Sequence, residues 1–97
     1  MSDWIRYRTV VESNKASLSI ESLETKFERF EDQWNGFVWL VSRDPGKISR
    51  KNIVNNIEYR LAHRSGDMSV GLPDIGVIYI YDDNEVEIID VEAWENI

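Results

Sequence analysis

Near the N-terminus of this 97-residue chain, apolar residues alternate with polar ones. Ile5, Tyr7 and Val11 fall on one side of the alternation, and Arg6 and Arg8 fall on the other. Because successive side chains of a β-strand point to opposite faces, this pattern predicts a half-buried strand. The short polar stretch that follows is expected to form a loop.

Apolar residues then recur in steps of three and four. They are Ile20, Leu23, Phe27, Phe30 and Trp34. Steps of this size place side chains on one stripe of an α-helix. Ser19 is positioned to cap the helix N-terminus, and Asn35-Gly36 is typical of a helix C-terminus. We therefore expect a helix over residues 20–34 with its apolar stripe in the core.

The unbroken apolar run Phe37–Val41 predicts a central strand that is covered on both faces. Proline and glycine in the segment Arg43–Gly46 then predict a turn. Beyond Ser49, which is positioned as a helix cap, apolar residues return at helical spacing. We therefore expect a second helix from about Arg50 to Arg64.

A longer connection and a hairpin are expected at the C-terminal end. Three glycines and a proline between Ser65 and Gly76 predict a loop of about a dozen residues. The apolar run Val77–Tyr81 predicts another buried strand, and Asp83-Asn84 predicts a two-residue turn that folds the chain back on itself.

This turn sets the register of the hairpin, with Tyr81 opposite Val86 and Tyr79 opposite Ile88. In the last strand the apolar residues change from one face to the other at Ile88-Ile89. A strand cannot change faces without a bulge, a twist or an end. The last strand is therefore expected to bend there and to lie at the edge of the sheet.

Together these elements predict an α+β fold in a single domain spanning residues 1–97. The expected order is β-α-β-α-β-β, with a mixed four-stranded sheet, two helices packed on it and a C-terminal antiparallel hairpin. The composition, with 42% hydrophobic and 30% charged residues, is that of a globular chain. The chain has no cysteine, no signal peptide and no apolar run long enough to span a bilayer, so we expect a cytoplasmic protein without membrane association.

The formal net charge of -7 comes entirely from the last sixteen residues, because the bases and acids before Asp82 balance. A segment with seven acids and no base attracts a basic protein surface and repels nucleic-acid phosphate. Trp94 lies among these acids and, like Trp4, is a candidate apolar anchor. The expected partner-binding residues are Asp82, Asp83, Glu85, Glu87, Asp90, Glu92 and Trp94. A merely solvated acidic edge is the alternative interpretation.

Catalytic templates are absent, so we expect no enzyme, no metal and no cofactor. The single histidine, His63, is expected at the surface end of the second helix. The glycine-spaced loop after it lacks a lysine and a following helix to hold phosphate. The acidic turn Asp82–Glu85 lacks the ligand order of a calcium loop. An enzyme would have to use His63 with Asp67 as an acid-base pair.

In size, charge and lack of catalytic groups, the chain resembles the small acidic inhibitors that bacteria use against nuclease toxins, the immunity proteins and antitoxins. The resemblance maps to no individual residues. It implies a protein that covers the active site of a basic nuclease toxin with its acidic hairpin. One alternative is a phage-encoded nucleic-acid mimic or anti-defence protein.

A second alternative is a nucleic-acid-binding module that uses the basic helix 50–64. Its basic residues are Lys47, Arg50, Lys51, Arg60 and Arg64, and Tyr59 would stack on a base. The acidic C-terminal end opposes the approach of a polyanion, so nucleic acid is the less favoured partner.

Overall fold

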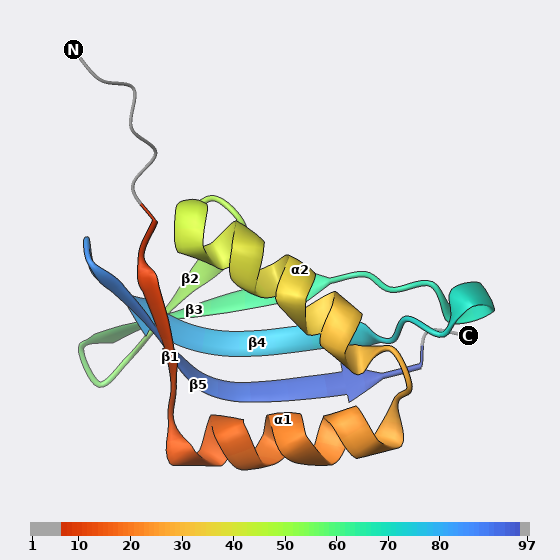
Figure 1. Cartoon of the computed structure of the whole chain (residues 1–97). Helices are drawn as coiled ribbons and strands as arrows, with labels where there is room; N and C mark the ends of the chain where they lie inside the picture. The colour runs from red at the N-terminus through yellow and green to blue at the C-terminus, as the bar shows by residue number, and fades with distance from the viewer. Residues whose placement is uncertain (1–6, 96–97) are drawn as a thin grey trace.

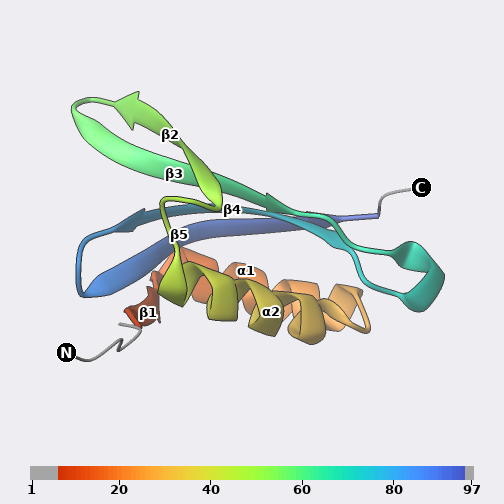
Figure 2. The same ribbon diagram turned by 90° about the horizontal axis from the view of Figure 1, so that it is seen from above.

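The computed structural model describes residues 7–95, which form a mixed five-stranded sheet with two helices on one of its faces (Figures 1 and 2). The elements in chain order are β1 (Thr9–Glu12), α1 (Asn14–Lys26), α2 (Phe30–Arg43), β2 (Ser49–Val54), β3 (Ile57–Arg64), the short 3-10 helix η1 (Met68–Val70), β4 (Asp74–Tyr81) and β5 (Glu85–Trp94). The α+β class is therefore confirmed.

The strand order across the sheet is β1-β5-β4-β3-β2. β2 to β5 are sequential and antiparallel, whereas β1 pairs in parallel with β5 and aligns Thr9 with Glu85. The two helices form the crossover from β1 to β2 and both cover the same face (Figure 2). The expected four strands and the order β-α-β-α-β-β are thus wrong, since the observed order is β-α-α-β-β-β-β. The expected start of the first strand, at residues 4–6, lies outside the described residues.

The helix expected over residues 20–34 is two helices, and the first begins earlier than expected. Ser13 caps α1, because its Oγ accepts a hydrogen bond from the backbone N–H of Ala16 at 3.1 Å. The chain turns at Phe27, which has an extended backbone, and restarts at Phe30. Both phenylalanines are buried, so the apolar spacing continues across the bend and does not reveal it.

The run Phe37–Val41 is part of α2, not a central strand. Phe37 and Val41 are buried against the sheet, while Trp39 on the opposite side of the helix is 57% exposed. A short apolar run fits a strand and a buried helix equally well by periodicity. Gly36 lies inside this helix and does not end it, and the flexible end of the Arg64 side chain packs over it.

The expected basic helix over residues 50–64 is the hairpin of β2 and β3. Its turn residues Asn55 and Asn56 both have positive φ, 52° and 65°, as a type I′ turn requires. The pairing runs from Val54 opposite Ile57 to Ser49 opposite Ala62. The helical spacing of the apolar residues in this segment arises from two strands and a turn.

The C-terminal hairpin follows the expected register. Tyr81 pairs with Val86, and Tyr79 pairs with Ile88. The pairing then shifts, with Ile78 opposite Asp90, which leaves Ile89 as the extra residue of a bulge. The expected bend is confirmed, but β5 is an edge only in part, because β1 covers its outer side as far as Ile88.

The core lies between the helices and the sheet. Stacked aromatic rings from α2 form its centre, with Trp34 5.4 Å from Phe37, which meets Tyr79 of β4 edge-on. From β5, Val86, Ile88 and Val91 are also buried. Neither helix of the described part of the chain has the length and apolar character to cross a bilayer. All helix cover lies on this side, so the opposite face of the sheet is left open.

Candidate functional site

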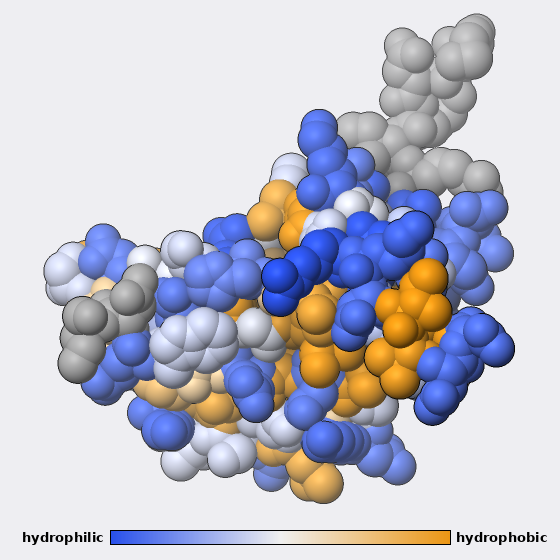
Figure 3. All heavy atoms as spheres, turned by 180° about the vertical axis from the view of Figure 1, so that it is seen from behind, coloured by the Kyte–Doolittle hydropathy of each residue, from blue (hydrophilic) through white to orange (hydrophobic). Residues whose placement is uncertain are grey.

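The open face of the sheet carries an apolar centre (Figure 3). Ala62 and Val77 point into the core, so their neighbours Leu61 and Ile78 point to the open side. The two are direct cross-strand partners, and Ile78 is 36% exposed. Soluble proteins rarely leave a contiguous apolar patch on a sheet face unless something docks there.

Charge changes sign along the row that crosses this centre. Arg50 of β2 is opposite Leu61, which is opposite Ile78, which in turn is opposite Asp90 of β5. A hollow of about 240 Å³ lies over the row, and Trp94 and Gly76 also line it. The site is thus an apolar hollow with Arg50 on one side and, on the other, Glu92 beside Asp90, whose carboxylate turns toward α1.

β5 supplies an acidic border to the open face, of which Glu92 lines the hollow while Glu85 and Glu87 lie outside it, beside the acidic turn. Val86 and Ile88 point into the core, so Glu85 and Glu87 point to the open face. The bulge at Ile89 then resets the alternation and brings Glu92 and Trp94 to the same face. Three carboxylates and one indole therefore share one strand face.

Trp94 is held flat against the sheet. Its indole stacks on the imidazole of His63, with ring centroids 5.6 Å apart and planes 18° from parallel. A Cβ at Gly76 would lie 3.3 Å from the same indole, so glycine provides the room for the ring. Trp94 remains 40% exposed in this position, which makes it a pre-oriented apolar anchor.

His63 is on β3 and not at the end of a helix, which corrects the expected placement. Its Nε2 lies 2.9 Å from Oδ2 of Asp74, whose Oδ1 accepts from the backbone N–H of Gly66 at 2.9 Å. Asp67, the expected acid-base partner, instead accepts from Ser69 in η1. The hydroxyl and the backbone N–H of Ser69 hold the pKa of Asp67 below its ordinary value.

The acidic turn Asp82–Glu85 is held together by hydrogen bonds between its own residues. Asp82 accepts from the backbone N–H groups of Asn84 and Glu85, each at 2.8 Å. The bond from Asn84, followed by the bond from Glu85, stabilises the carboxylate and lowers the pKa of Asp82. The positive charge of Arg8 lowers this pKa further. Asp83 is exposed at the tip of the same turn. Both residues lie beyond the end of the apolar hollow.

Asp90 turns away from the acidic border toward α1. Its carboxylate lies 3.1 Å from Nζ of Lys15 and accepts from Ser19 Oγ at 3.3 Å and from the N–H of Val91 at 2.9 Å. Partial burial raises the pKa of Asp90, but Lys15 and the two hydrogen bonds together outweigh it, so the pKa is lowered. Of the seven expected site residues, this one fastens the helix to the sheet.

The basic residues do not form one surface, contrary to the helix proposed for them. Arg60 turns under the sheet and donates to the carbonyls of Gly46 at 2.8 Å and Ser49 at 3.0 Å. Arg64 donates to Oε1 of the buried Gln33 at 2.6 Å. These arginines hold the loops and α2 in place.

Leu61 and Ile78 are the site residues that sequence reasoning missed. A helix over residues 50–64 would have Leu61 on its apolar face, and the apolar run Val77–Tyr81 predicts a buried strand that contains Ile78. The useful signal was the pair Asn55-Asn56 between β-branched residues, which favours a hairpin. Within residues 7–95, no three metal-ligating side chains are grouped closely enough to hold an ion.

Neither a family model, nor a curated protein, nor a solved structure matches this chain.

Proposed function

We propose that this chain is a protein-binding inhibitor that docks the open face of its sheet on a basic surface of another protein. The observation that carries the proposal is the apolar hollow over Leu61 and Ile78 with its acidic border on β5. Apolar contact supplies affinity at the centre of an interface, and complementary charge at its rim speeds association and selects the partner.

The most concrete form of the proposal is an immunity protein that covers the active site of a basic nuclease toxin. A nuclease binds phosphate with basic side chains, and the carboxylates of Glu85, Glu87 and Glu92 are suited to occupy them. Trp94 adds a rigid anchor next to these acids. This form rests on charge complementarity, as does the alternative of a nucleic-acid mimic.

A nucleic-acid-binding role receives less support from the same surface. The open face directs carboxylates outward, while Arg60 and Arg64 are engaged inside the fold. A polyanion approaching the open face would meet Glu87 and Glu92. Arg50 is the single base in the central row.

The test begins with affinity capture from the source cell and identification of the partner by mass spectrometry. Association is then measured for the triple charge reversal of Glu85, Glu87 and Glu92 to lysine. The expected result is an on-rate at least about tenfold slower, with a large loss of salt dependence. Inhibition assays on the captured partner check whether binding blocks its activity.

A matched control reverses the same number of acids on the other side of the molecule. Glu21, Glu24 and Glu28 are exposed, on α1 and just after it. Their reversal changes the net charge equally but leaves the open face intact, so we expect an on-rate within about threefold of the original. Equal effects of the two triple variants would contradict docking through the open face.

A further inference from the structure

The outer edge of β5 is paired along the first half of the strand and unpaired along the second half within the described residues. β1 pairs with its first half and stops at Glu12 opposite Ile88. At Ser13 the chain leaves the sheet and enters α1, and the Ser13 N–H donates to the carbonyl of Ile88 at 2.9 Å. No strand in the described range 7–95 continues along β5 beyond that point.

The backbone of this second half is oriented for pairing. Val91 donates its N–H to the Asp90 side chain, outside the ladder with β4, so the peptide groups of Val91 face outward. Ala93, two residues further, has the same orientation by the period of the strand. The Val91 N–H is already bonded to Asp90, so this outer edge offers an added strand the carbonyl of Val91 and the N–H and carbonyl of Ala93.

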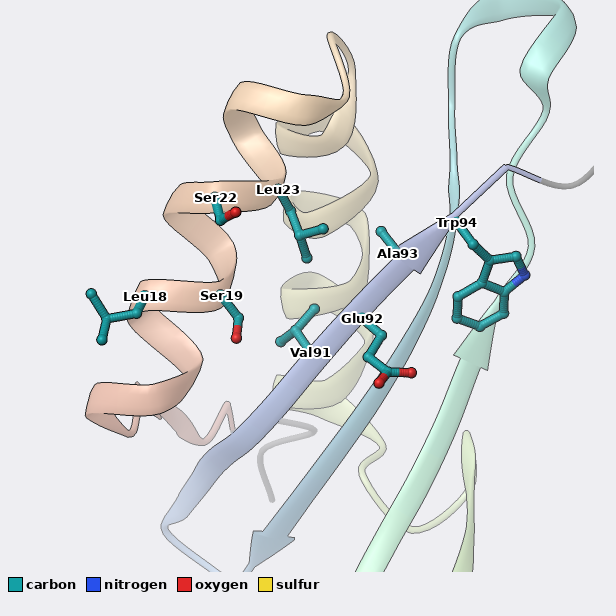
Figure 4. A pocket seen from close by; sticks show the side chains of 8 residues that line it. All are labelled: Leu18, Ser19, Ser22, Leu23, Val91, Glu92, Ala93 and Trp94. Atoms are coloured by element: carbon teal, nitrogen blue, oxygen red, sulfur yellow. The ribbon is translucent and has the colours of Figure 1, made fainter.

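A groove of about 540 Å³ runs beside this edge (Figure 4). α1 runs alongside this edge and forms the other wall of the groove (Figure 4). The lining residues are Leu18, Ser19, Ser22 and Leu23 of α1 and Val91, Glu92, Ala93 and Trp94 of β5. Leu18 is 69% exposed, and the serines keep the helix surface low. The groove therefore has a largely apolar and serine-lined wall on α1 and an unpaired strand edge on β5.

We propose that this groove binds an extended segment of another protein, which adds to the sheet beside Val91 and Ala93. Residues of the segment opposite Val91 and Ala93 would face α1, so apolar side chains fit there. The residue opposite Glu92 would face the open side, so lysine or arginine fits there. The expected ligand is an extended segment that alternates apolar and basic residues.

A second copy of this chain is the less suitable occupant. Two copies paired through this edge would bring their Glu92 side chains together, and each copy carries a net charge of -7. A basic extended segment would instead be attracted by the negative charge of Glu92 on β5. Glu92 and Trp94 line both this groove and the central hollow, whereas Leu61 and Ile78 line the hollow alone, so substitutions of Leu61 and Ile78 separate the two surfaces.

The test uses a fluorescent peptide, acetyl-Ser-Val-Lys-Val-Lys-Val-Ser-amide, and two comparison peptides. One has glutamate in place of lysine, and the other has the same residues with the three valines adjacent. Fluorescence anisotropy is expected to show saturable binding of the alternating basic peptide below about 1 mM, at least about tenfold tighter than either comparison peptide. Absence of saturable binding, or equal binding of the three, overturns the proposal.

Variants locate the binding. Ser22→Tyr fills the groove from an exposed helix position and is expected to weaken peptide binding at least about tenfold, whereas Ser17→Tyr, outside the groove on the same helix, leaves it unchanged. Glu92→Lys is expected to transfer the preference to the glutamate peptide. Unaltered binding by Ser22→Tyr would place the peptide elsewhere and overturn the proposal.

One variant distinguishes failure of the groove proposal from failure of the proposal that the open face binds a protein. A Leu61→Ser/Ile78→Ser variant removes the apolar centre of the open face and lies outside the groove, so peptide binding is expected to persist in it. Loss of partner binding with intact peptide binding would support the open face and the groove as distinct surfaces. Loss of peptide binding in this variant would overturn the groove as an independent site.

Discussion

The imidazole of His63 lies on the indole of Trp94 and at the same time bonds to Asp74, which is 3% exposed. The histidine therefore connects a buried carboxylate to the most prominent aromatic side chain of the open face. Stacking of aromatic rings contributes about 0.5–1.5 kcal/mol beyond the burial of area. The orientation of Trp94 depends on this contact and on the space above Gly76.

Replacement of His63 by alanine is expected to release the indole and weaken the fold. We expect a loss of about 1–2 kcal/mol in the free energy of unfolding, from the lost stack and the lost bond to Asp74. Urea unfolding measures the loss, and near-ultraviolet circular dichroism reports the order of Trp94. His63→Phe is the matched variant, because it keeps a ring under the indole but not the bond. An unchanged near-ultraviolet spectrum in His63→Ala would contradict the role assigned to the stack.

Glycine has a steric role at Gly66 that it does not have at Gly36. A Cβ at Gly66 would lie 2.2 Å from the backbone oxygen of Leu72, which cannot move away without displacing the loop. At Gly36 the obstacle is the flexible end of Arg64, and alanine gains about 1 kcal/mol in helix propensity. We expect Gly66→Ala to lower the free energy of unfolding by at least about 2 kcal/mol and Gly36→Ala to change it by less than about 1 kcal/mol. Equal effects in chemical denaturation would refute this distinction.

The turn between β2 and β3 offers a stabilising substitution. Asn56 has a φ of 65°, a conformation that glycine adopts without a steric penalty. Asn56→Gly is therefore expected to raise the free energy of unfolding by up to about 1 kcal/mol, and Asn56→Val to lower it by about 1–2 kcal/mol. Thermal denaturation of both variants is the measurement. A more stable valine variant would be incompatible with the positive φ.

Stability at acid pH is expected to depend on Asp90. Its pKa is lowered in the folded protein, so protonation favours unfolding. The contribution of Asp90 is complete above the unfolded pKa near 3.9 and disappears as the pH falls through the lower folded pKa. In Asp90→Asn, the free energy of unfolding should fall less steeply between pH 4 and 2 than in the unsubstituted chain. Denaturant titrations across that range provide the comparison, with exposed Asp83→Asn as the control.

The C-terminal hairpin was predictable because its information is local. Asp83-Asn84 and the matching apolar residues on either side determine the turn and the pairing of Tyr79 with Ile88. The change of parity at Ile88-Ile89 also located the bulge. Each of these features involves residues close in sequence, and so they can be recognised without knowledge of the rest of the fold.

The middle of the chain was not predictable in the same way. The spacing of Ile53, Ile57 and Leu61 matches one face of a helix, and periodicity alone does not distinguish that helix from two strands with a turn between them. The same ambiguity concealed the helical state of Phe37–Val41. The periodicity assigned a strand to Phe37–Val41, which is helical, and a helix to residues 50–64, which form two strands. The acidic border on β5 was therefore expected, but the apolar centre beside it was not.

Because Thr9 pairs in parallel with Glu85, β1 cannot join the sheet during synthesis until β5 has been made. Until the ribosome has released β5, the helices lack the buried side chains of Val86, Ile88 and Val91 against which they pack. A nascent chain that ends before residue 85 therefore exposes the apolar side of α1, the helix that packs mainly on β5, to solvent and to chaperones. The same strand that carries the charge of the mature surface thus completes the core and ends the vulnerable stage of folding.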